Sequence, residues 1–140
     1  MSKIKITLNR DKVSVIANLK DEISPNTCKS FVNCLPVKTT ATHARWCGDE
    51  IWAAIKGVSK YEKESETMLP NKGEILLVPV SEDECHLTIW YGRGWCFGPE
   101  GFVLGNVVGE IENLSDEFIK ACNGLILNGR DEMLIEIIED

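Results

Sequence analysis

The sequence predicts a mainly β domain, a closed β-barrel of about eight strands with an α-helix capping each open end. Two observations predict it. Most apolar segments alternate with polar residues at a period of two, which is typical of strands with one buried face. Only two segments show the apolar spacing of an amphipathic helix, and one lies in each half of the chain. The length of 140 residues fits a single domain spanning residues 1–140.

In the first half of the chain, two hairpins are predicted to flank a helix. Their strands are Lys3–Leu8, Val13–Leu19, His43–Cys47 and Glu50–Ile55. Turn-forming residues separate the strands of each pair. Between the hairpins, Ser24 suits the N-cap of a helix and Pro25 its first position, and the apolar spacing stops at Pro36.

The second half is predicted to contain four further strands and a second helix. The strands are Gly73–Val80, Cys85–Tyr91, Asn106–Ile111 and Met133–Ile138. Ser115 is the predicted N-cap of the helix, which stops near Asn128. The polar stretch Val58–Lys72 is predicted to be a surface loop and is the best candidate for a mobile flap. Gly92–Gly105 holds five glycines and is predicted to be a crossing loop.

Charge and hydropathy exclude two classes of partner. Fifteen Lys and Arg residues against 22 Asp and Glu residues give a net charge of −7, which repels a phosphate backbone. We therefore expect no nucleic-acid partner. No apolar run approaches the roughly 18 residues of a membrane span, so we expect no membrane partner. The opening residues lack the apolar run of a signal peptide, so we expect a cytoplasmic protein.

The six cysteines are predicted to be free thiols, most of them acting as small hydrophobic side chains. Without an export signal, no oxidising compartment favours disulfide bonds. The sequence contains no C-x-x-C pair, and His43 and His86 have no usual zinc spacing. We therefore expect neither a metal nor a cofactor.

Strand alternation predicts a binding patch on the outer face of the sheet. If Leu87 and Ile89 are core residues, the alternate residues of their strand point outward. The same alternation in the second hairpin predicts that Trp46 is buried. The residues predicted to point outward include His43, Arg45, Glu50, Trp52, His86 and Trp90. Two histidines, an arginine and two tryptophans are too aromatic for a plain solvated surface.

Each of these residues also has a structural interpretation. Trp52 and Trp90 are equally consistent with packing under the predicted loop Val58–Lys72 or with a homodimer interface. His86 is consistent with a partly buried strand histidine, and Arg45 with a salt bridge to one of the many carboxylates. These alternatives stay open at the level of sequence.

The order of these elements resembles the cyclophilin-like fold over nearly the whole chain. The Pro-x-Thr-x-x-x-Phe pattern at Pro25–Phe31 is similar to the entry to the first cyclophilin helix. Thr42–Arg45 is similar to the stretch that carries the cyclophilin catalytic arginine, and Gly105–Ile111 is similar to a late strand of that fold. The resemblance implies the closed barrel and places Arg45 where that arginine lies.

A closer resemblance is to the DUF3830 family of short bacterial and archaeal cyclophilin-like proteins of unknown function. The most distinctive match is the pattern His-Ala-Arg-Trp-x-Gly-x-Glu-x-Trp at His43–Trp52, and Gly73–Leu77 and Tyr91–Gly92 also match. This resemblance implies the fold. It implies no particular reaction, since the family has no settled one.

The chain departs from true cyclophilins in its pocket residues. In cyclophilins the loop after the catalytic arginine supplies Phe, Met and Gln to grip the proline, whereas here the chain runs from Arg45 directly into Glu50–Ile55. Asn106 takes the place of the late pocket histidine, which makes it a candidate ligand-binding residue. Trp95 lies in a glycine-rich run that opens no helix, so it is predicted to be presented on a flexible loop rather than to belong to a phosphate loop.

These observations predict a protein that binds a small anionic or amide-bearing metabolite on the outer sheet face. The candidate binding residues are His43, Arg45, Trp52, His86, Trp90, Trp95 and Asn106. One alternative is an enzyme acting on a small amide or cyclic imide, with Arg45 polarising a carbonyl and His43 moving a proton. A less favoured alternative is a peptidyl-prolyl cis-trans isomerase. Assembly into a homo-oligomer stays open.

Because the three gripping residues are missing, a proline-containing test peptide is expected to isomerise no faster with the protein than in buffer. A protease-coupled isomerisation assay checks this. Catalysis well above background that is lost in Arg45→Ala would contradict it.

Overall fold

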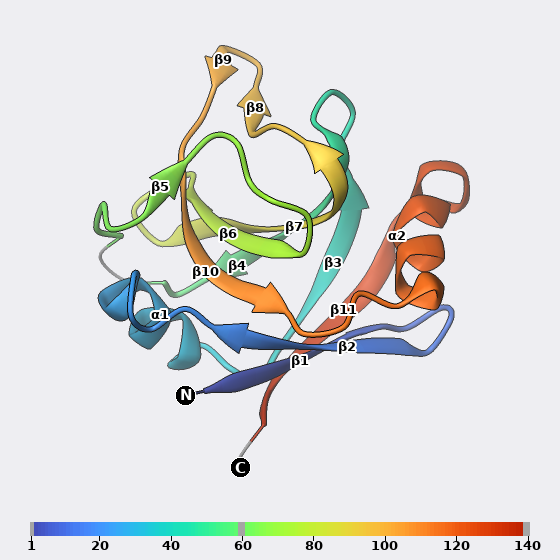
Figure 1. Ribbon diagram of the computed structural model, residues 1–140, viewed down its shortest axis with the longest axis horizontal. Helices are drawn as coiled ribbons and strands as arrows, with labels where there is room; N and C mark the ends of the chain where they lie inside the picture. The colour runs from blue at the N-terminus through green and yellow to red at the C-terminus, as the bar shows by residue number, and fades with distance from the viewer. Residues whose placement is uncertain (1, 59–60, 139–140) are drawn as a thin grey trace.

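The computed structural model describes residues 2–58 and 61–138, and these form the predicted mainly β barrel (Figure 1). The barrel strands are β1 (Lys3–Leu8), β2 (Val13–Leu19), β3 (Val37–His43), β4 (Gly48–Lys56), β6 (Glu74–Pro79), β7 (Glu84–Gly94), β10 (Gly105–Ile111) and β11 (Asp131–Ile138). Their order is β2-β1-β11-β3-β4-β7-β6-β10, and pairing of β10 with β2 closes the barrel. The strand pairs are antiparallel.

The barrel interior is filled by the alternate apolar residues of these strands. Ile6 pairs with Ile135 across β1 and β11, and Ile51 pairs with Ile89 across β4 and β7. All four side chains are fully buried. Removing them from water is the main stabilisation of the fold, at about 25 cal/mol per Å² of apolar surface. Among the described residues, the interior is thus a packed apolar core.

Two helices, α1 (Pro25–Val32) and α2 (Asp116–Asn128), lie at opposite sides of the barrel (Figure 1). Ser115 caps α2 as predicted, because its hydroxyl accepts a hydrogen bond from the backbone N–H of Phe118. Ser24 occupies the N-cap position of α1, but its side chain makes no capping bond. No helix among the described residues is long and apolar enough to cross a membrane.

The prediction of a strand over His43–Cys47 is wrong. That strand, β3, spans Val37–His43 and begins directly after Pro36, and residues 44–47 leave the sheet before β4. β-branched residues at 37, 39, 40 and 42 favour the earlier position. The turn requires glycine at Gly48, where φ is +80° and a side chain would collide with the backbone oxygen of Arg93.

The two predicted loops carry short strands. Within the predicted loop Val58–Lys72, β5 (Glu66–Thr67) pairs with β10. Residues 59–60 of this predicted loop, and residues 1 and 139–140, lie outside the described part of the chain. Within Gly92–Gly105, β7 continues to Gly94, and β8 (Phe97–Gly98) and β9 (Gly101–Phe102) then form a small hairpin.

Asn106, on β10, holds the segment that precedes β5. Its side-chain oxygen accepts hydrogen bonds from the backbone N–H groups of Glu64 and Ser65, both at 3.0 Å. Its amide nitrogen donates to the hydroxyl of Thr27 at 2.8 Å and to the carbonyl of Glu62. Asn106 is fully buried, so these bonds replace those to water and tie α1, β10 and the loop together.

Asn106→Ala is therefore expected to lower the free energy of unfolding by about 3 kcal/mol, because it leaves buried donors and acceptors without partners. Urea denaturation measures this. The control is Asn113→Ala at an exposed position, where we expect a change within about 0.5 kcal/mol. Equal stability of the two variants would show that the Asn106 network does not hold the loop.

Candidate functional site

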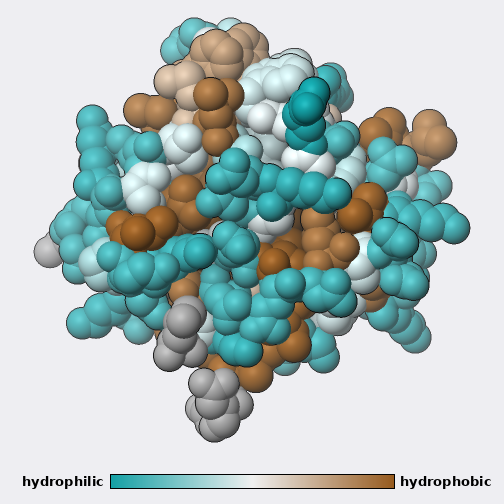
Figure 2. All heavy atoms as spheres, viewed as in Figure 1, coloured by the Kyte–Doolittle hydropathy of each residue, from teal (hydrophilic) through white to brown (hydrophobic). Residues whose placement is uncertain are grey.

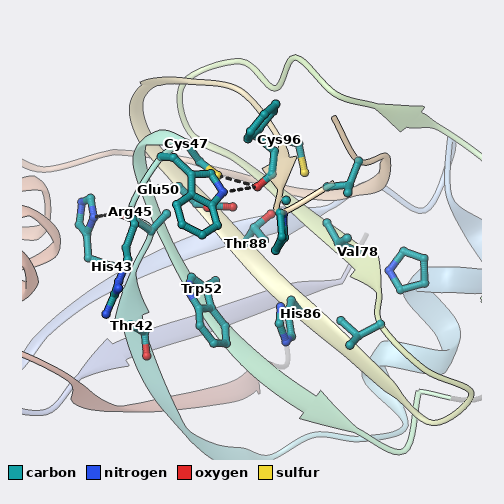
Figure 3. A pocket seen from close by; sticks show the side chains of 18 of the residues that line it. Thr42, His43, Arg45, Cys47, Glu50, Trp52, Val78, His86, Thr88 and Cys96 are labelled. Carbon is teal, nitrogen blue, oxygen red and sulfur yellow. Dashed lines mark hydrogen bonds between the residues drawn. The ribbon is translucent and has the colours of Figure 1, made fainter. Parts of the chain in front are cut away.

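A pocket of about 570 Å³ lies on the outer face of β4 and β7, beside the end of β3 (Figure 3). Its walls come from the turn between β3 and β4, from the outward residues of β4 and β7, from residues 78–80 at the end of β6, and from segment 96–103. The register pairs Trp52 with Thr88 and Ala54 with His86, so alternate residues of both strands project to the same side. The pocket therefore lies on the sheet face predicted from strand alternation.

Trp52 and His86 form one wall of the pocket. Their rings stack with centroids 4.4 Å apart and planes inclined by 23°, as Figure 3 shows. Burial lowers the pKa of His86, and Glu84, whose carboxylate lies 3.9 Å from its ring nitrogen, only partly opposes this. At neutral pH the wall is thus an uncharged aromatic surface suited to a planar group.

Glu50 places a carboxyl group inside the same pocket. Its exposed fraction is only 5%, and no Lys, Arg or His among the described residues forms an ion pair with it. Burial raises its pKa to about 8, and a hydrogen bond with Cys47 opposes this only weakly. At neutral pH, Glu50 is therefore mainly a neutral carboxylic acid that can donate a proton.

Two thiols border Glu50. Cys47 donates a hydrogen bond from its Sγ to the carbonyl oxygen of Phe97 at 3.0 Å. Burial, reinforced by the nearby Glu50 carboxyl, raises the pKa of Cys47 to about 11 and that of Cys96 to about 12. Both stay protonated at neutral pH, so neither is an activated thiolate nucleophile.

Two side chains of the turn before β4 stand at the pocket rim. Trp46 has an exposed fraction of 48%, which corrects the prediction that it is buried, and its indole N–H donates to the Phe97 carbonyl at 3.1 Å. Arg45 is exposed, and the described part of the chain gives it no ion pair, so the predicted salt-bridge alternative finds no support. Arg130, before β11, adds a second cation to the lining.

His43 also lines the pocket, but not on the face expected for it. It shares a strand face with the buried Ala41, so its ring turns toward the barrel end, where Nε2 bonds the hydroxyl of Tyr91 at 2.5 Å. Its Nδ1 lies 2.7 Å from the Ala44 carbonyl oxygen. Since a carbonyl only accepts, Nδ1 carries a proton. Both ring nitrogens of His43 are therefore occupied by protein groups.

Three other predicted residues do not line the pocket. Trp90 does point to the outer face, but it is fully buried in a second apolar cluster and donates to the Thr88 hydroxyl at 3.1 Å. Segment 95–103 covers this part of the sheet, with apolar side chains at its surface around β8 and β9 (Figure 2). Trp95 is 40% exposed, and Asn106 serves the loop network described above.

The loop Val58–Lys72 is not a flap over this pocket. Its described residues, 58 and 61–72, contribute nothing to the lining, because Asn106 and the pairing of β5 with β10 fix the loop elsewhere. Several lining residues were not predicted as site residues, among them Trp46, Arg130 and Glu50. Of these, Glu50 is the one whose chemistry is unusual. Its signal was present, since Glu50 alternates with Trp52 and so shares its face.

Comparisons with known proteins identify a family and a shared fold. A family model described as "Protein of unknown function (DUF3830)" matches residues 6–136, and no curated protein matches the chain. The structure of McbB in complex with tryptophan is similar with a TM-score of 0.75 and 17% identity, over 95% of this chain and 44% of McbB, so the chain spans less than half of that protein. The solution structure of the hypothetical protein AF2241 from Archaeoglobus fulgidus has a TM-score of 0.60 and 18% identity, over 96% of this chain and 93% of that one.

The raised pKa of Glu50 predicts a pH-dependent stability. Between the ordinary pKa of 4.5 and the folded value of about 8, the unfolded state releases this proton while the folded state keeps it. The free energy of unfolding therefore falls as pH rises through this window, by up to roughly 1.4 kcal/mol per pH unit. Glu50→Gln is expected to remove this dependence, so its stability relative to wild type increases from pH 5 to pH 8.

Urea denaturation at pH 5, 6.5 and 8 measures this slope. The control is Glu110→Gln, an exposed position outside the pocket, which we expect to keep the wild-type slope. Parallel pH profiles for wild type and Glu50→Gln would show that Glu50 titrates alike in both states.

Proposed function

The chain belongs to the DUF3830 family of proteins of unknown function, and we propose that its pocket binds a small metabolite carrying a carboxylate and a planar group. The observation that carries the proposal is Arg45. It is an exposed guanidinium at the rim of an aromatic-walled pocket, and the described residues offer it no carboxylate partner.

A carboxylate suits this rim. The guanidinium of Arg45 presents fixed donors in a plane, which match two carboxylate oxygens, and Arg130 adds positive charge to the same lining. In an acidic protein of net charge −7, a local cationic rim is needed to attract an anion. Such attraction weakens with salt.

A planar group suits the wall. Trp52 and His86 stack on each other, and Trp46 stands at the rim, so a ring or conjugated group gains contact with aromatic faces. McbB, which shares this fold, is described in complex with tryptophan, a carboxylate that carries a planar ring. That description supports the ligand class without naming this protein's ligand.

An amide or imide is the alternative ligand, and Glu50 supports it. In its neutral form, Glu50 donates a hydrogen bond to a carbonyl oxygen. The enzyme alternative built on His43 is less well supported, because Tyr91 and the Ala44 carbonyl occupy both ring nitrogens. As part of the proposal, the protein works without a cofactor in the cytoplasm, where its six free cysteines stay reduced. Assembly of this chain into a homo-oligomer remains part of the proposal, because the pocket occupies one face of the barrel and leaves other faces for contacts between copies.

We expect benzoate and indole-3-carboxylate to bind the wild-type protein, and Arg45→Ala to weaken that binding about 10- to 150-fold. This corresponds to the loss of a charge-assisted contact of about 1.5–3 kcal/mol. Isothermal titration calorimetry at low and moderate salt measures it. Benzamide and succinimide, run in parallel, test the neutral alternative.

The matched control is Arg93→Ala, which removes an exposed arginine outside the pocket lining and is expected to bind as wild type does. If carboxylates bind wild type and Arg45→Ala equally, Arg45 is not the anchor. If only the neutral ligands bind, the amide alternative replaces the carboxylate proposal.

A further inference from the structure

Glu50 lies within a pocket that also offers an anion-binding rim and an aromatic wall. Glu50 as a residue has an exposed fraction of only 5%, and it lines the same pocket as Trp52, Thr88 and Cys96. Burying a carboxyl group without a cation costs free energy, and a buried carboxyl group of perturbed pKa inside a pocket is a candidate for proton transfer. Figure 3 shows it deep between Cys47 and Thr88.

Position determines which part of a ligand meets Glu50. Glu50 and Trp52 are two residues apart on β4 and share its outer face, which separates them by roughly 7 Å along the strand. A ligand whose ring lies against Trp52 and whose carboxylate lies at Arg45 presents the atoms between those groups to the interior of the pocket, where Glu50 is. Those middle atoms are the ones on which an acid would act.

We propose that Glu50 is a catalytic residue that transfers protons on a bound 2-oxo carboxylate and interconverts its keto and enol forms. The proposal deepens the proposed function and rests on it, since Arg45 binds the carboxylate and Trp52 contacts the planar group. It adds the substrate class, a 2-oxo acid with hydrogen on the carbon next to the carbonyl, and a reaction, tautomerisation.

The step needs one neutral carboxylic acid and no co-reactant. The O–H of Glu50 gives its proton to the carbonyl oxygen of the substrate, and the other Glu50 oxygen takes a proton from the adjacent carbon. The electron pair of the broken C–H bond becomes the C=C bond of the enol, and the π pair of the carbonyl forms the new O–H bond. Glu50 ends as the acid it was at the start, so atoms and electrons balance.

The surroundings of Glu50 favour this form of the residue. Its pKa of about 8 keeps Glu50 protonated at neutral pH. Because this pKa lies near the working pH, the group can both give and take a proton. Cys47 and Cys96, the other titratable groups beside it, have pKa values raised by burial to about 11 and about 12, so they stay neutral over the same range. The rate is therefore expected to fall as pH rises through about 8.

The test is hydrogen–deuterium exchange of phenylpyruvate in D₂O, followed by the loss of its methylene signal in proton NMR. Wild-type protein is expected to exchange the methylene protons faster than buffer, and Glu50→Gln to reduce the catalysed rate at least about 100-fold. Glu110→Gln is the matched control and is expected to keep the wild-type rate. Aliphatic 2-oxobutanoate is expected to bind less tightly, because it cannot stack on Trp52.

Binding of phenylpyruvate to each variant, measured by calorimetry, separates this inference from the proposed function. If phenylpyruvate binds in an Arg45-dependent way but exchanges at the buffer rate, the catalytic role is overturned and the binding site stands. Equal rates for wild type and Glu50→Gln also overturn it. If phenylpyruvate does not bind, both proposals fail for 2-oxo carboxylates.

Discussion

The pairing of β10 with β2 is the constraint on which the rest of this structure depends. It joins the ends of the sheet into a barrel whose interior is filled by interlocking side chains such as Ile6, Ile51 and Ile89. Among the described residues, apolar side chains fill the barrel interior. The pocket lies outside it, between segments that stand up from the outer sheet face. The turn before β4 and segment 96–103 provide those walls.

Building a pocket on the outer face produces two apolar layers on opposite sides of one sheet. Leu87 and Ile89 of β7 face the barrel interior, whereas Trp90 faces outward and is still buried, because segment 95–103 covers it. The covering is incomplete beside β4. There the outward side chains of Trp52 and His86 form the aromatic wall of the pocket, and the outward side chain of Glu50 lies inside it. The pocket thus lies beside the second apolar cluster, where segment 95–103 no longer covers the outer sheet face.

Sequence patterns predicted most of the barrel, because one-sided burial imposes a period of two that depends only on neighbouring residues. These patterns gave wrong predictions where a residue is buried by a segment distant in sequence, because the neighbouring residues then carry no sign of that burial. Trp90 occupies an outward position, and nothing in its own strand reveals that a distant segment covers it. The β3–β4 turn was misplaced because the β-branched residues after Pro36 carry no clear apolar alternation. Glu50 was placed on the correct face but given no role, since its burial depends on side chains 40 residues away, such as Trp90.

The chemistry of a carboxyl group in this protein follows its surroundings rather than its residue type, as Glu64 and Glu50 show. At Glu64 burial is the largest single influence and raises the pKa, but the hydrogen bonds from Thr27 and Asn26 at the start of α1 together outweigh it, so the pKa is lowered. Glu64 is therefore a fixed anion that stabilises a helix N-terminus. Burial raises the pKa of Glu50, and its hydrogen bond with Cys47 does not offset this, so Glu50 retains a proton near neutral pH. One glutamate contributes to the fold as a charge, and the other lines the pocket as a carboxyl group that keeps its proton near neutral pH.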